Sequence, residues 1–357
     1  GTVSRKPWTL ALDPGNEGLT MDDTILEVTD LSVEFATYGG VVQAVRGVSF
    51  TVQRGKTLAI VGESGCGKSV TVQSIMGLTP VPPGKINSGT ALLNGKNILG
   101  LDTKAANQFR GVEIGMIFQD PMSSLNPTMT IGNQIAETLM VHRGKSNRDA
   151  LREATVLLER TQIPEAAKRA KQYPFEFSGG MLQRAMIAQS LACNPSILIA
   201  DEPTTALDVT IQAQILELMQ ELQRTENMSI ILITHDLAVV ARMADEVAVM
   251  YAGEIVESGS VDDIFYKSAH PYTLGLKQAM PSNTANREKQ LIPIHGSPPD
   301  LFAPPVGCGY YARCPHAMKT CERNPPELFA LGDEHYAKCW LQHPDAPTVD
   351  ALNQIDN

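Results

Sequence analysis

The chain has 357 residues, of which 43% are hydrophobic, and its formal net charge is -10. This length and apolar content allow one large core and a second, smaller one. The acidic balance argues against a general nucleic-acid binder, because such proteins need basic surface to displace counterions from phosphates. No apolar run approaches the roughly 20 residues of a membrane-spanning helix, and we see no secretory signal, so we expect a soluble, cytoplasmic protein.

The first part of the chain predicts an antiparallel sheet that leads into a buried strand. Residues 1–24, rich in Gly, Pro and polar side chains, are expected to form a flexible extension or a cloning remnant. Residues 25–55 alternate apolar and polar positions, as strands with one buried face do. The apolar run 58–61 is predicted as a buried strand, and residues 70–78 as the helix after the next loop.

The loop between that strand and that helix has the pattern Gly-x-x-x-x-Gly-Lys-Ser over residues 62–69. Its glycines let successive backbone N–H groups converge on phosphate oxygens, Lys68 adds a positive charge, and the Ser69 hydroxyl can reach Mg²⁺. We therefore predict that this loop binds the phosphates of ATP. The predicted contact residues are Gly62, Ser64, Gly65, Cys66, Gly67, Lys68, Ser69 and Val70.

Residues 122–185 are rich in helical pattern and are predicted to form a helical subdomain, with amphipathic segments at 131–141 and 148–161. It ends in Ser178-Gly179-Gly180, a loop that opens the helix 181–193 and so offers a second anion site made of backbone N–H groups. One chain has little need of two phosphate sites on one nucleotide. We therefore expect this loop to cap an ATP held by a second copy or a homologue.

Two acids follow the apolar run 197–200. Asp201 is placed at the end of a buried strand, where a carboxylate can hold Mg²⁺. The adjacent Glu202 is the best candidate to orient and deprotonate the attacking water. The alternative is that both acids cap a helix before Pro203.

Two further polar residues stand at predicted strand ends. Gln119 follows the apolar residues 116–118 and can ligate Mg²⁺ or its water, although a lone Gln would be an ordinary surface residue. His235 ends the strand 231–234 and can reach a γ-phosphate oxygen, although a lone His is more often structural. With a helix at 211–225 between the last two strands, the pattern predicts an α/β domain with a mainly parallel sheet.

The order of these motifs resembles the nucleotide-binding subunit of ABC transporters over roughly residues 25–265. The resemblance implies an ABC-type P-loop NTPase domain that has an antiparallel β subdomain and a helical subdomain, binds ATP and Mg²⁺, and dimerises on ATP. In that family's terms the motifs are Walker A 62–69, the Q-loop Gln119, the signature 177–181, Walker B 197–202, the D-loop with Asp208, and the H-loop His235.

Two positions bear on how closely the family pattern is followed. The signature has Met181 where Gln is common, but the phosphate-contacting Ser and Gly residues are kept. Tyr38 stands about where the family stacks an aromatic ring on adenine. Phe35 is nearby, and a core position for the aromatic ring is an equal alternative.

Longer segments are similar to the ATPases of oligopeptide and dipeptide importers, namely 118–127, 200–210, 270–273, 307–308 and 313–317. Residues 295–299 also fit, although the family often has Pro at position 295. The resemblance implies a subunit on the cytoplasmic face of the bacterial inner membrane that energises import of peptides or a related small solute.

Its implied partners are two transmembrane permease subunits, a second ATPase subunit, for which the resemblance favours a paralogue over a copy, and indirectly an extracytoplasmic substrate-binding protein. The alternative is a soluble ABC ATPase acting on ribosomes or nucleic acid. Such proteins usually carry two ATPase domains or a long coiled-coil insertion, and this chain has one set of motifs.

Residues 266–357 are rich in Pro and are predicted to form a small separate module with four cysteines spaced C-x5-C-x6-C-x17-C. Four thiolates suit tetrahedral Zn²⁺ or an iron–sulfur cluster, and the lack of C-x2-C pairs favours the cluster. Some peptide-importer ATPases carry a [4Fe–4S] cluster in a module that resembles this one. Four reduced, metal-free cysteines are the remaining alternative. The predicted ligands, to which we assign a structural role, are Cys308, Cys314, Cys321 and Cys339.

Overall fold

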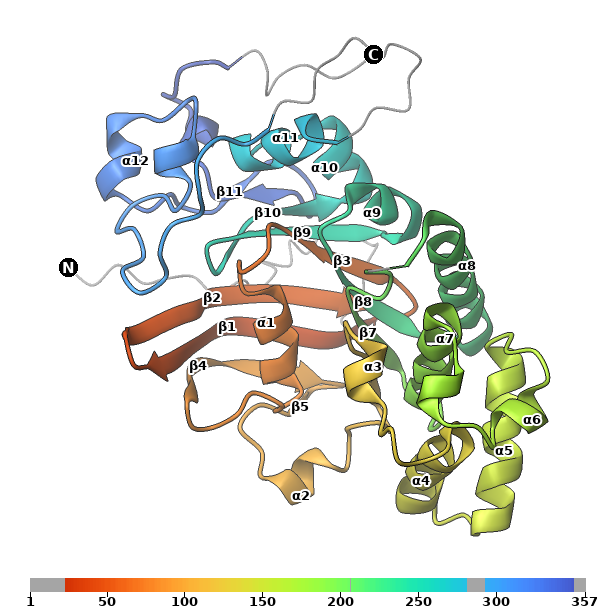
Figure 1. Cartoon of the computed structure of the whole chain (residues 1–357). Coiled ribbons are helices and arrows are strands. Elements are labelled where there is room, and N and C mark those ends of the chain that lie inside the picture. The colour runs from red at the N-terminus through yellow and green to blue at the C-terminus, as the bar shows by residue number, and fades with distance from the viewer. Residues whose placement is uncertain (1–22, 206, 281–292, 350–357) are drawn as a thin grey trace. The chain divides into compact units, whose positions relative to one another are not determined.

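The computed structural model describes residues 23–205, 207–280 and 293–349, and its contacts divide the chain into two compact units (Figure 1). The first unit is formed by Gly1–Gln53, Leu58–Gly100 and Thr234–Asn357. The second is formed by Arg54–Thr57 and Leu101–Ile233. The predicted N-terminal extension lies almost entirely outside the described residues, and the predicted domain boundaries remain predictions.

The first unit contains a four-stranded antiparallel sheet in the order β2-β1-β4-β5. The alternation expected for residues 25–55 is confirmed in two parts of β1, where Leu26 and Val28 are buried and, beyond an irregularity, Leu31 and Val33 are buried. Register shifts in both β1 pairings mark bulges along that strand. The strands are β1 (Thr24–Thr37), β2 (Gly40–Gln53), β4 (Gly84–Leu93) and β5 (Lys96–Asn97).

The same unit holds a run of strands in the order β11-β12-β10-β9-β3. β3 and β9 are parallel, and the outer pairings are antiparallel. The C-terminal segment contributes β11 and β12, which extend this run beyond β10. The strands are β3 (Thr57–Val61), β9 (Glu246–Tyr251), β10 (Glu254–Ser260), β11 (Phe329–Ala330) and β12 (Tyr336–Ala337).

The helices of the first unit are short. The predicted helix at 70–78 begins two residues earlier, at Lys68, and ends at Ile75. The Pro-rich region beyond 265 has more regular structure than its sequence predicts, since His270 caps a helix that starts at Pro271. The helices are α1 (Lys68–Ile75), α9 (Leu237–Met243), α10 (Val261–Tyr266), α11 (Pro271–Gln278) and α12 (Lys319–Arg323), with 3-10 turns at Tyr311–Arg313 and Trp340–Gln342.

The second unit contains three parallel strands in the order β8-β7-β6. They are β6 (Ile114–Ile117), β7 (Ile197–Asp201) and β8 (Ser229–Thr234), and every residue of β7 and β8 is buried. The parallel pairings, here and between β3 and β9, confirm the expected α/β class.

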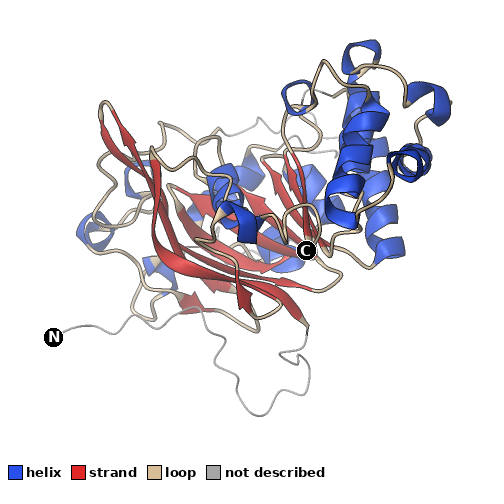
Figure 2. Cartoon of the chain, turned by 90° about the horizontal axis from the view of Figure 1, so that it is seen from below, coloured by secondary structure: helices blue, strands red, loops and turns tan. Residues whose placement is uncertain are grey.

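Helices form the rest of the second unit and are seen as the group of blue helices in Figure 2. An apolar cluster joins α4, α5 and α7, to which α5 contributes Ala150, Ala154, Leu157 and Leu158 at helical spacing. The helices are α2 (Thr103–Ala106), α3 (Pro121–Ser124), α4 (Ile131–Arg143), α5 (Asn147–Arg160), α6 (Ala166–Arg169), α7 (Gly179–Ser190) and α8 (Val209–Glu226), with a 3-10 turn at Pro174–Glu176. None of the described helices has both the length and the apolar character needed to cross a bilayer.

Candidate functional site

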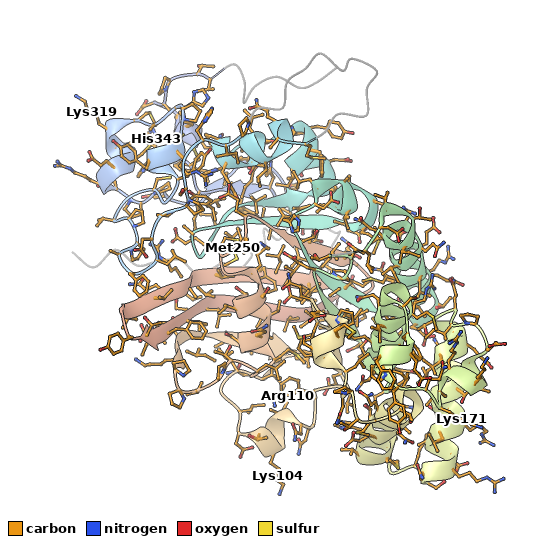
Figure 3. All side chains as sticks on the ribbon, in the orientation of Figure 1. Lys104, Arg110, Lys171, Met250, Lys319 and His343 are labelled. Carbon is orange, nitrogen blue, oxygen red and sulfur yellow. The ribbon has the colours of Figure 1, made fainter. Side chains whose placement is uncertain are left out.

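The predicted phosphate loop joins β3 to α1, as its motif requires, and two of its glycines are in tight contact with other backbone. A Cβ on Gly62 would lie 2.1 Å from the carbonyl oxygen of Met250, labelled in Figure 3. A Cβ on Gly67, at φ +106, would lie 2.3 Å from the carbonyl oxygen of Ala44. Only glycine fits at these two positions, so the loop's backbone runs directly against β9 and β2.

Lys68 is almost fully buried, and its ammonium group is turned toward the loop's own backbone. Its Nζ donates to the carbonyl oxygens of Gly62 at 2.7 Å and of Glu63 at 2.9 Å. The neighbouring Cys66 is buried, and burial raises the pKa of its thiol even though Lys68 opposes the shift. The loop therefore has one cation at its centre beside a neutral thiol.

The remaining residues of the loop are more accessible. Ser64 and Gly65 are exposed, and nothing lies within 4 Å of the position a Gly65 Cβ would take. Ser69 and Val70 are half-buried in the first turn of α1. Backbone N–H groups at the tip of the loop and at the start of the helix can therefore reach a ligand.

Two residues outside the motif also contact the loop at Glu63. The Glu63 N–H donates to the Tyr272 hydroxyl oxygen at 2.9 Å, and Arg313 donates to both carboxylate oxygens of Glu63. Sequence reasoning missed all three residues as parts of this site. The only available signal was that Tyr272 and Arg313 lie in segments similar to the importer ATPases.

Tyr38 and His235, also in the first unit, are both exposed. Tyr38 occupies the turn between β1 and β2 and is fully exposed, so the alternative of a core position is wrong. His235 directly follows β8, as predicted, and Asp236 after it caps α9 through the N–H of Ala238. Contact of these two rings with a nucleotide remains a prediction.

In the second unit, the predicted acids lie at the end of β7. Asp201 is the buried last residue of the strand. Glu202 follows with φ +48, and its N–H donates to Ile233. The helix-capping alternative is wrong, because the next helix, α8, begins at Val209 and is capped by Asp208.

The structure brings Gln119 to Glu202. Gln119 Nε2 donates to Glu202 Oε2 at 2.9 Å, and Thr205 Oγ1 donates to the same oxygen at 2.9 Å. These two side-chain donors orient the carboxylate. An oriented, ionised carboxylate can accept a proton from water.

The predicted signature loop and Asp208 are also neighbours. Ser178 caps α7 by accepting from the Met181 N–H, and Asp208 caps α8 by accepting from the Ile211 N–H. A Cβ on Gly180 would lie 2.8 Å from Ile211 Cγ2, so the two helix starts are in close contact. Two helix N-termini, each a favourable place for an anion, therefore lie together.

The predicted site residues are divided between the two units. The loop with Lys68 belongs to the first unit, whereas Asp201, Glu202 and Gln119 belong to the second.

The four C-terminal cysteines are near one another. Cys308 donates its N–H to the Cys321 carbonyl, and burial raises the pKa of Cys308 to about 11 and of Cys339 to about 12, with the other cysteines adding to both shifts. Metal binding needs thiolates and releases their protons, and burial favours the neutral thiols while no metal is bound. Within the part of the chain that the structure describes, no group of three or more His, Cys, Asp or Glu side chains is arranged to hold a metal ion. The predicted [4Fe–4S] or zinc centre is therefore not supported.

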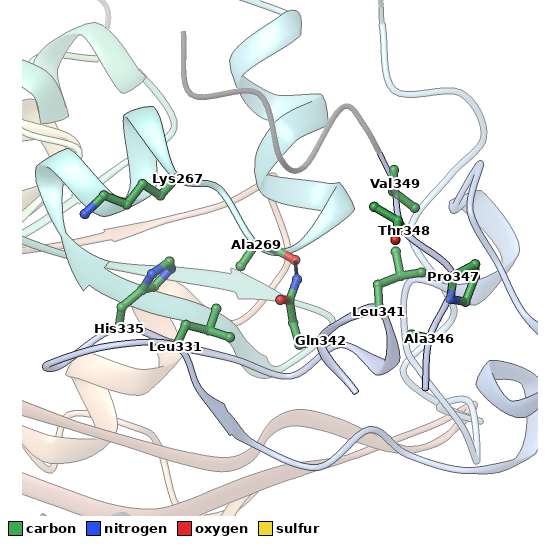
Figure 4. A pocket seen from close by; sticks show the side chains of 10 residues that line it. All are labelled: Lys267, Ala269, Leu331, His335, Leu341, Gln342, Ala346, Pro347, Thr348 and Val349. Atoms are coloured by element: carbon green, nitrogen blue, oxygen red, sulfur yellow. Dashed lines mark hydrogen bonds between the residues drawn. The ribbon is translucent and has the colours of Figure 1, made fainter. Parts of the chain in front are cut away.

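A cavity of about 390 Å³ lies in the C-terminal part of the first unit (Figure 4). At its wall, Gln342 Nε2 donates to the Ala269 carbonyl oxygen at 2.6 Å, and His335 Nε2 is hydrogen-bonded to the carboxylate of the buried Glu257. No predicted nucleotide-site residue lines this cavity. The lining residues are Lys267, Ala269, Leu331, His335, Leu341, Gln342, Ala346, Pro347, Thr348 and Val349.

Comparison with known proteins decides the family. Residues 45–205 match the ABC transporter family, and residues 256–321 match the family described as the C-terminal region of oligopeptide/dipeptide transporters. The chain is 57% identical over 326 residues to the oligopeptide transport ATP-binding protein OppD of Bacillus subtilis, covering 91% of both chains. The chain belongs to the ABC transporter ATP-binding subunits, in their oligopeptide/dipeptide branch.

Other relatives of this ABC family give the same picture. The chain is 55% identical to the dipeptide transport ATP-binding protein DppD of B. subtilis, covering 90% of this chain and 95% of the relative. It is 51% identical to OppD of Salmonella typhimurium, covering 87% and 92%. None of these comparisons favours the alternative of an ATPase acting on ribosomes or nucleic acid.

Solved ABC cassettes confirm the fold. A dimeric ATP-binding cassette bound to ADP and phosphate after hydrolysis matches with a TM-score of 0.60 at 26% identity, covering 66% of this chain and 98% of that one. The cassette CbiO1 from Clostridium perfringens matches with a TM-score of 0.57 at 28% identity, covering 68% and 91%. The chain has the ABC-type P-loop NTPase fold and is an ATP-hydrolysing transport enzyme.

Proposed function

We propose that this ABC subunit powers bacterial import of dipeptides, oligopeptides or a related small solute. The observation that carries the proposal is the 57% identity to an oligopeptide transport ATP-binding protein along 91% of both chains. That coverage includes the C-terminal region that a general ABC cassette lacks. ATP would bind between two ATPase subunits, and hydrolysis would reset the transporter.

In the first unit, the loop 62–69 would bind the phosphates. Lys68 now donates to the carbonyl oxygens of Gly62 and Glu63 and would turn to the β- and γ-phosphates. The Ser69 hydroxyl would ligate Mg²⁺, and the exposed Tyr38 would stack on the adenine. The further contacts would be the backbone N–H groups of Gly62, Ser64, Gly65, Cys66, Gly67 and Val70.

In the second unit, Glu202 would deprotonate the attacking water, since Gln119 and Thr205 already orient its carboxylate. Asp201 and Gln119 would hold Mg²⁺ or its water ligands. His235 of the first unit would contact the γ-phosphate. In each half of the dimer, the Ser178-Gly179-Gly180 loop and Asp208 would close on the ATP held by the opposite subunit.

The partners would be two transmembrane permease subunits and a second ATPase subunit, a paralogue. An extracytoplasmic binding protein would deliver the substrate to the permeases. The chain would lie on the cytoplasmic face of the inner membrane, with its predicted helical subdomain against the permeases. No nucleic acid takes part.

The four C-terminal cysteines would bind a [4Fe–4S] cluster, or zinc as the alternative, that stabilises the C-terminal module. Their mutual proximity supports this, but binding would require all four thiols to lose protons and draw together. Absorbance near 400 nm with about four Fe per chain, lost in Cys314→Ser, would support it. A colourless, metal-free protein of unchanged stability would contradict it.

The transport proposal is tested by co-expressing the chain with its candidate permeases and second ATPase, and reconstituting the complex in proteoliposomes. We expect ATP-dependent uptake of labelled dipeptides or oligopeptides that stops in the Glu202→Gln variant. ATP hydrolysis without uptake of any peptide, or purification with ribosomes in place of permeases, would overturn the proposal.

A further inference from the structure

Glu63 places a carboxylate inside the predicted phosphate loop, next to the cation that would meet ATP. Its own carbonyl oxygen accepts from Lys68 Nζ at 2.9 Å. A carboxylate in a loop that holds a triphosphate repels the triphosphate, and because the Glu63 side chain is 25% exposed, salt screens part of this repulsion. The loop therefore contains a charge that opposes the function we propose for it.

Arg313 neutralises that charge from 250 residues further along the chain. Its two terminal nitrogens donate to the two oxygens of Glu63 at 2.6 and 2.9 Å, a bidentate arrangement that fixes orientation as well as charge. The Arg313 side chain is 5% exposed. The Glu63 side chain is 25% exposed, so the ion pair is largely but not fully shielded from solvent.

The surroundings of Arg313 hold the guanidinium in place. Nε donates to the carbonyl oxygen of His295 at 3.0 Å, and further bonds reach Ile294 and the Tyr251 hydroxyl. The guanidinium also lies 5.8 Å from the centre of the Tyr251 ring. An arginine with so many fixed contacts is pre-organised, so holding Glu63 costs little additional side-chain entropy.

Tyr272 holds the same loop residue by its backbone. Its hydroxyl accepts the Glu63 N–H, and its ring packs 4.5 Å from Tyr251 and 5.4 Å from Tyr310, measured between ring centres. Both Tyr272 and Arg313 lie in the region after residue 265. The backbone and the carboxylate of Glu63 are therefore both set by C-terminal residues.

We propose that Arg313 is a positioning residue for nucleotide binding: it masks the charge of Glu63 and fixes the phosphate loop in its ATP-accepting form. The inference rests on the proposed function, because it presumes that the loop binds ATP. It makes the C-terminal region a requirement for nucleotide affinity.

The test measures MgATP binding to the full-length subunit by titration calorimetry for the wild type and a set of variants, five proteins before the controls. They are the wild type, Arg313→Met, Glu63→Gln, the double variant Glu63→Gln/Arg313→Met, and Arg313→Lys. Arg323→Met is the matched control, since Arg323 is an exposed arginine on α12 in the same region. The titrations are run at low salt and at about 0.5 M KCl, where charge repulsion is screened.

We expect Arg313→Met to raise the Kd for MgATP about tenfold or more at low salt, and this ratio to the wild type to shrink at high salt. The double variant should have a Kd within about threefold of the wild-type value, because it lacks the carboxylate that Arg313→Met leaves unpaired. Arg313→Lys should have an intermediate Kd, since lysine keeps the positive charge but cannot make the bidentate contact with the Glu63 carboxylate. Arg323→Met should bind about as the wild type does, and Glu63→Gln supplies the single-variant reference that the double-mutant cycle needs.

A purely structural role for Arg313 predicts a different pattern, in which the double variant binds as weakly as Arg313→Met and salt makes no difference. That result, or unchanged binding in Arg313→Met, would overturn the inference. Should Arg313→Met not fold, Arg313→Lys and the double variant still decide. Lys68→Ala tests the role of the loop separately from the role of Arg313. Normal MgATP binding in Lys68→Ala would contradict the proposed role of the loop. Loss of binding in Lys68→Ala together with normal binding in Arg313→Met would contradict only the role of Arg313.

Discussion

The two halves of the predicted nucleotide site are supported in different ways. In the second unit, Glu202 is held by Gln119 and Thr205, both near recognisable motifs. In the first unit, the phosphate loop is held at Glu63 by residues 209 and 250 positions away. The half predicted to perform the chemistry is thus built from its own motifs, while the half predicted to bind phosphate contacts distant parts of the chain.

The largest effect should come from the self-contained half. Glu202→Gln should lower ATP hydrolysis by about 10² to 10⁴-fold while leaving MgATP binding intact, because only the proton acceptor is lost. Steady-state hydrolysis and ATP-dependent dimerisation check this. Glu221→Gln, an exposed glutamate on α8, is the control. Hydrolysis near the wild-type rate in Glu202→Gln would show that another group is the base.

Burial of His270 in the C-terminal region should make the folding stability of the first unit sensitive to acid. His270 caps α11 through Nδ1 and is fully buried, which lowers its pKa to about 3, and its Nε2 has no hydrogen-bond partner among the residues that the structure describes. Below pH 6.5 the unfolded state takes up a proton that the folded state refuses, so stability falls as the pH drops from about 6.5 toward 3, by up to about 1.4 kcal/mol per unit.

Urea unfolding at a series of pH values measures that slope. His270→Asn keeps a capping oxygen without the titrating ring and should show a shallower dependence over the same range. An identical slope in the two proteins would place the acid sensitivity elsewhere.

A substitution in the phosphate loop itself should have a smaller effect. Lys68→Ala should weaken MgATP binding by about 2 to 3 kcal/mol, the usual value of hydrogen bonds to a charged group. Calorimetric titration checks this against Lys85→Ala, an exposed lysine on β4. Equal loss in both variants would mean that only general positive charge matters.

The smallest effect tests the close approach of α7 and α8. Gly180→Ala places a Cβ 2.8 Å from Ile211 Cγ2 and should cost about 1 to 3 kcal/mol of stability through overpacking. Gly179→Ala, whose Cβ would lie 3.8 Å from Leu207, should be tolerated better. Thermal melting of both variants decides, and equal melting temperatures would contradict the packing argument.

Strand ends and helix starts were predictable because local sequence determines them. Asp201 ends a run of apolar residues, and Ser178 precedes a helix that it caps, so both were placed correctly. The strand-end position of Gln119 was predicted, but its hydrogen bond to Glu202 was not; the two residues meet because β6 and β7 are parallel neighbours.

Long-range contacts were not predictable in this way. Nothing around Glu63 in the sequence indicates Arg313, because an ion pair leaves no periodic pattern. The two-residue strands β11 and β12 are too short for an alternation to be seen. The cysteine spacing predicted a metal centre, yet spacing says nothing about burial, which raises the pKa of Cys308 and of Cys339.

The separation between Glu63 and Arg313 also sets an order of events during synthesis. At about 5 to 20 residues per second, the ribosome adds Arg313 roughly 12 to 50 seconds after Glu63. Through that interval the nascent chain already contains β3, the phosphate loop and α1, but the loop carboxylate has no counterion. Arg313 is thus added after all the other residues placed at the predicted nucleotide site.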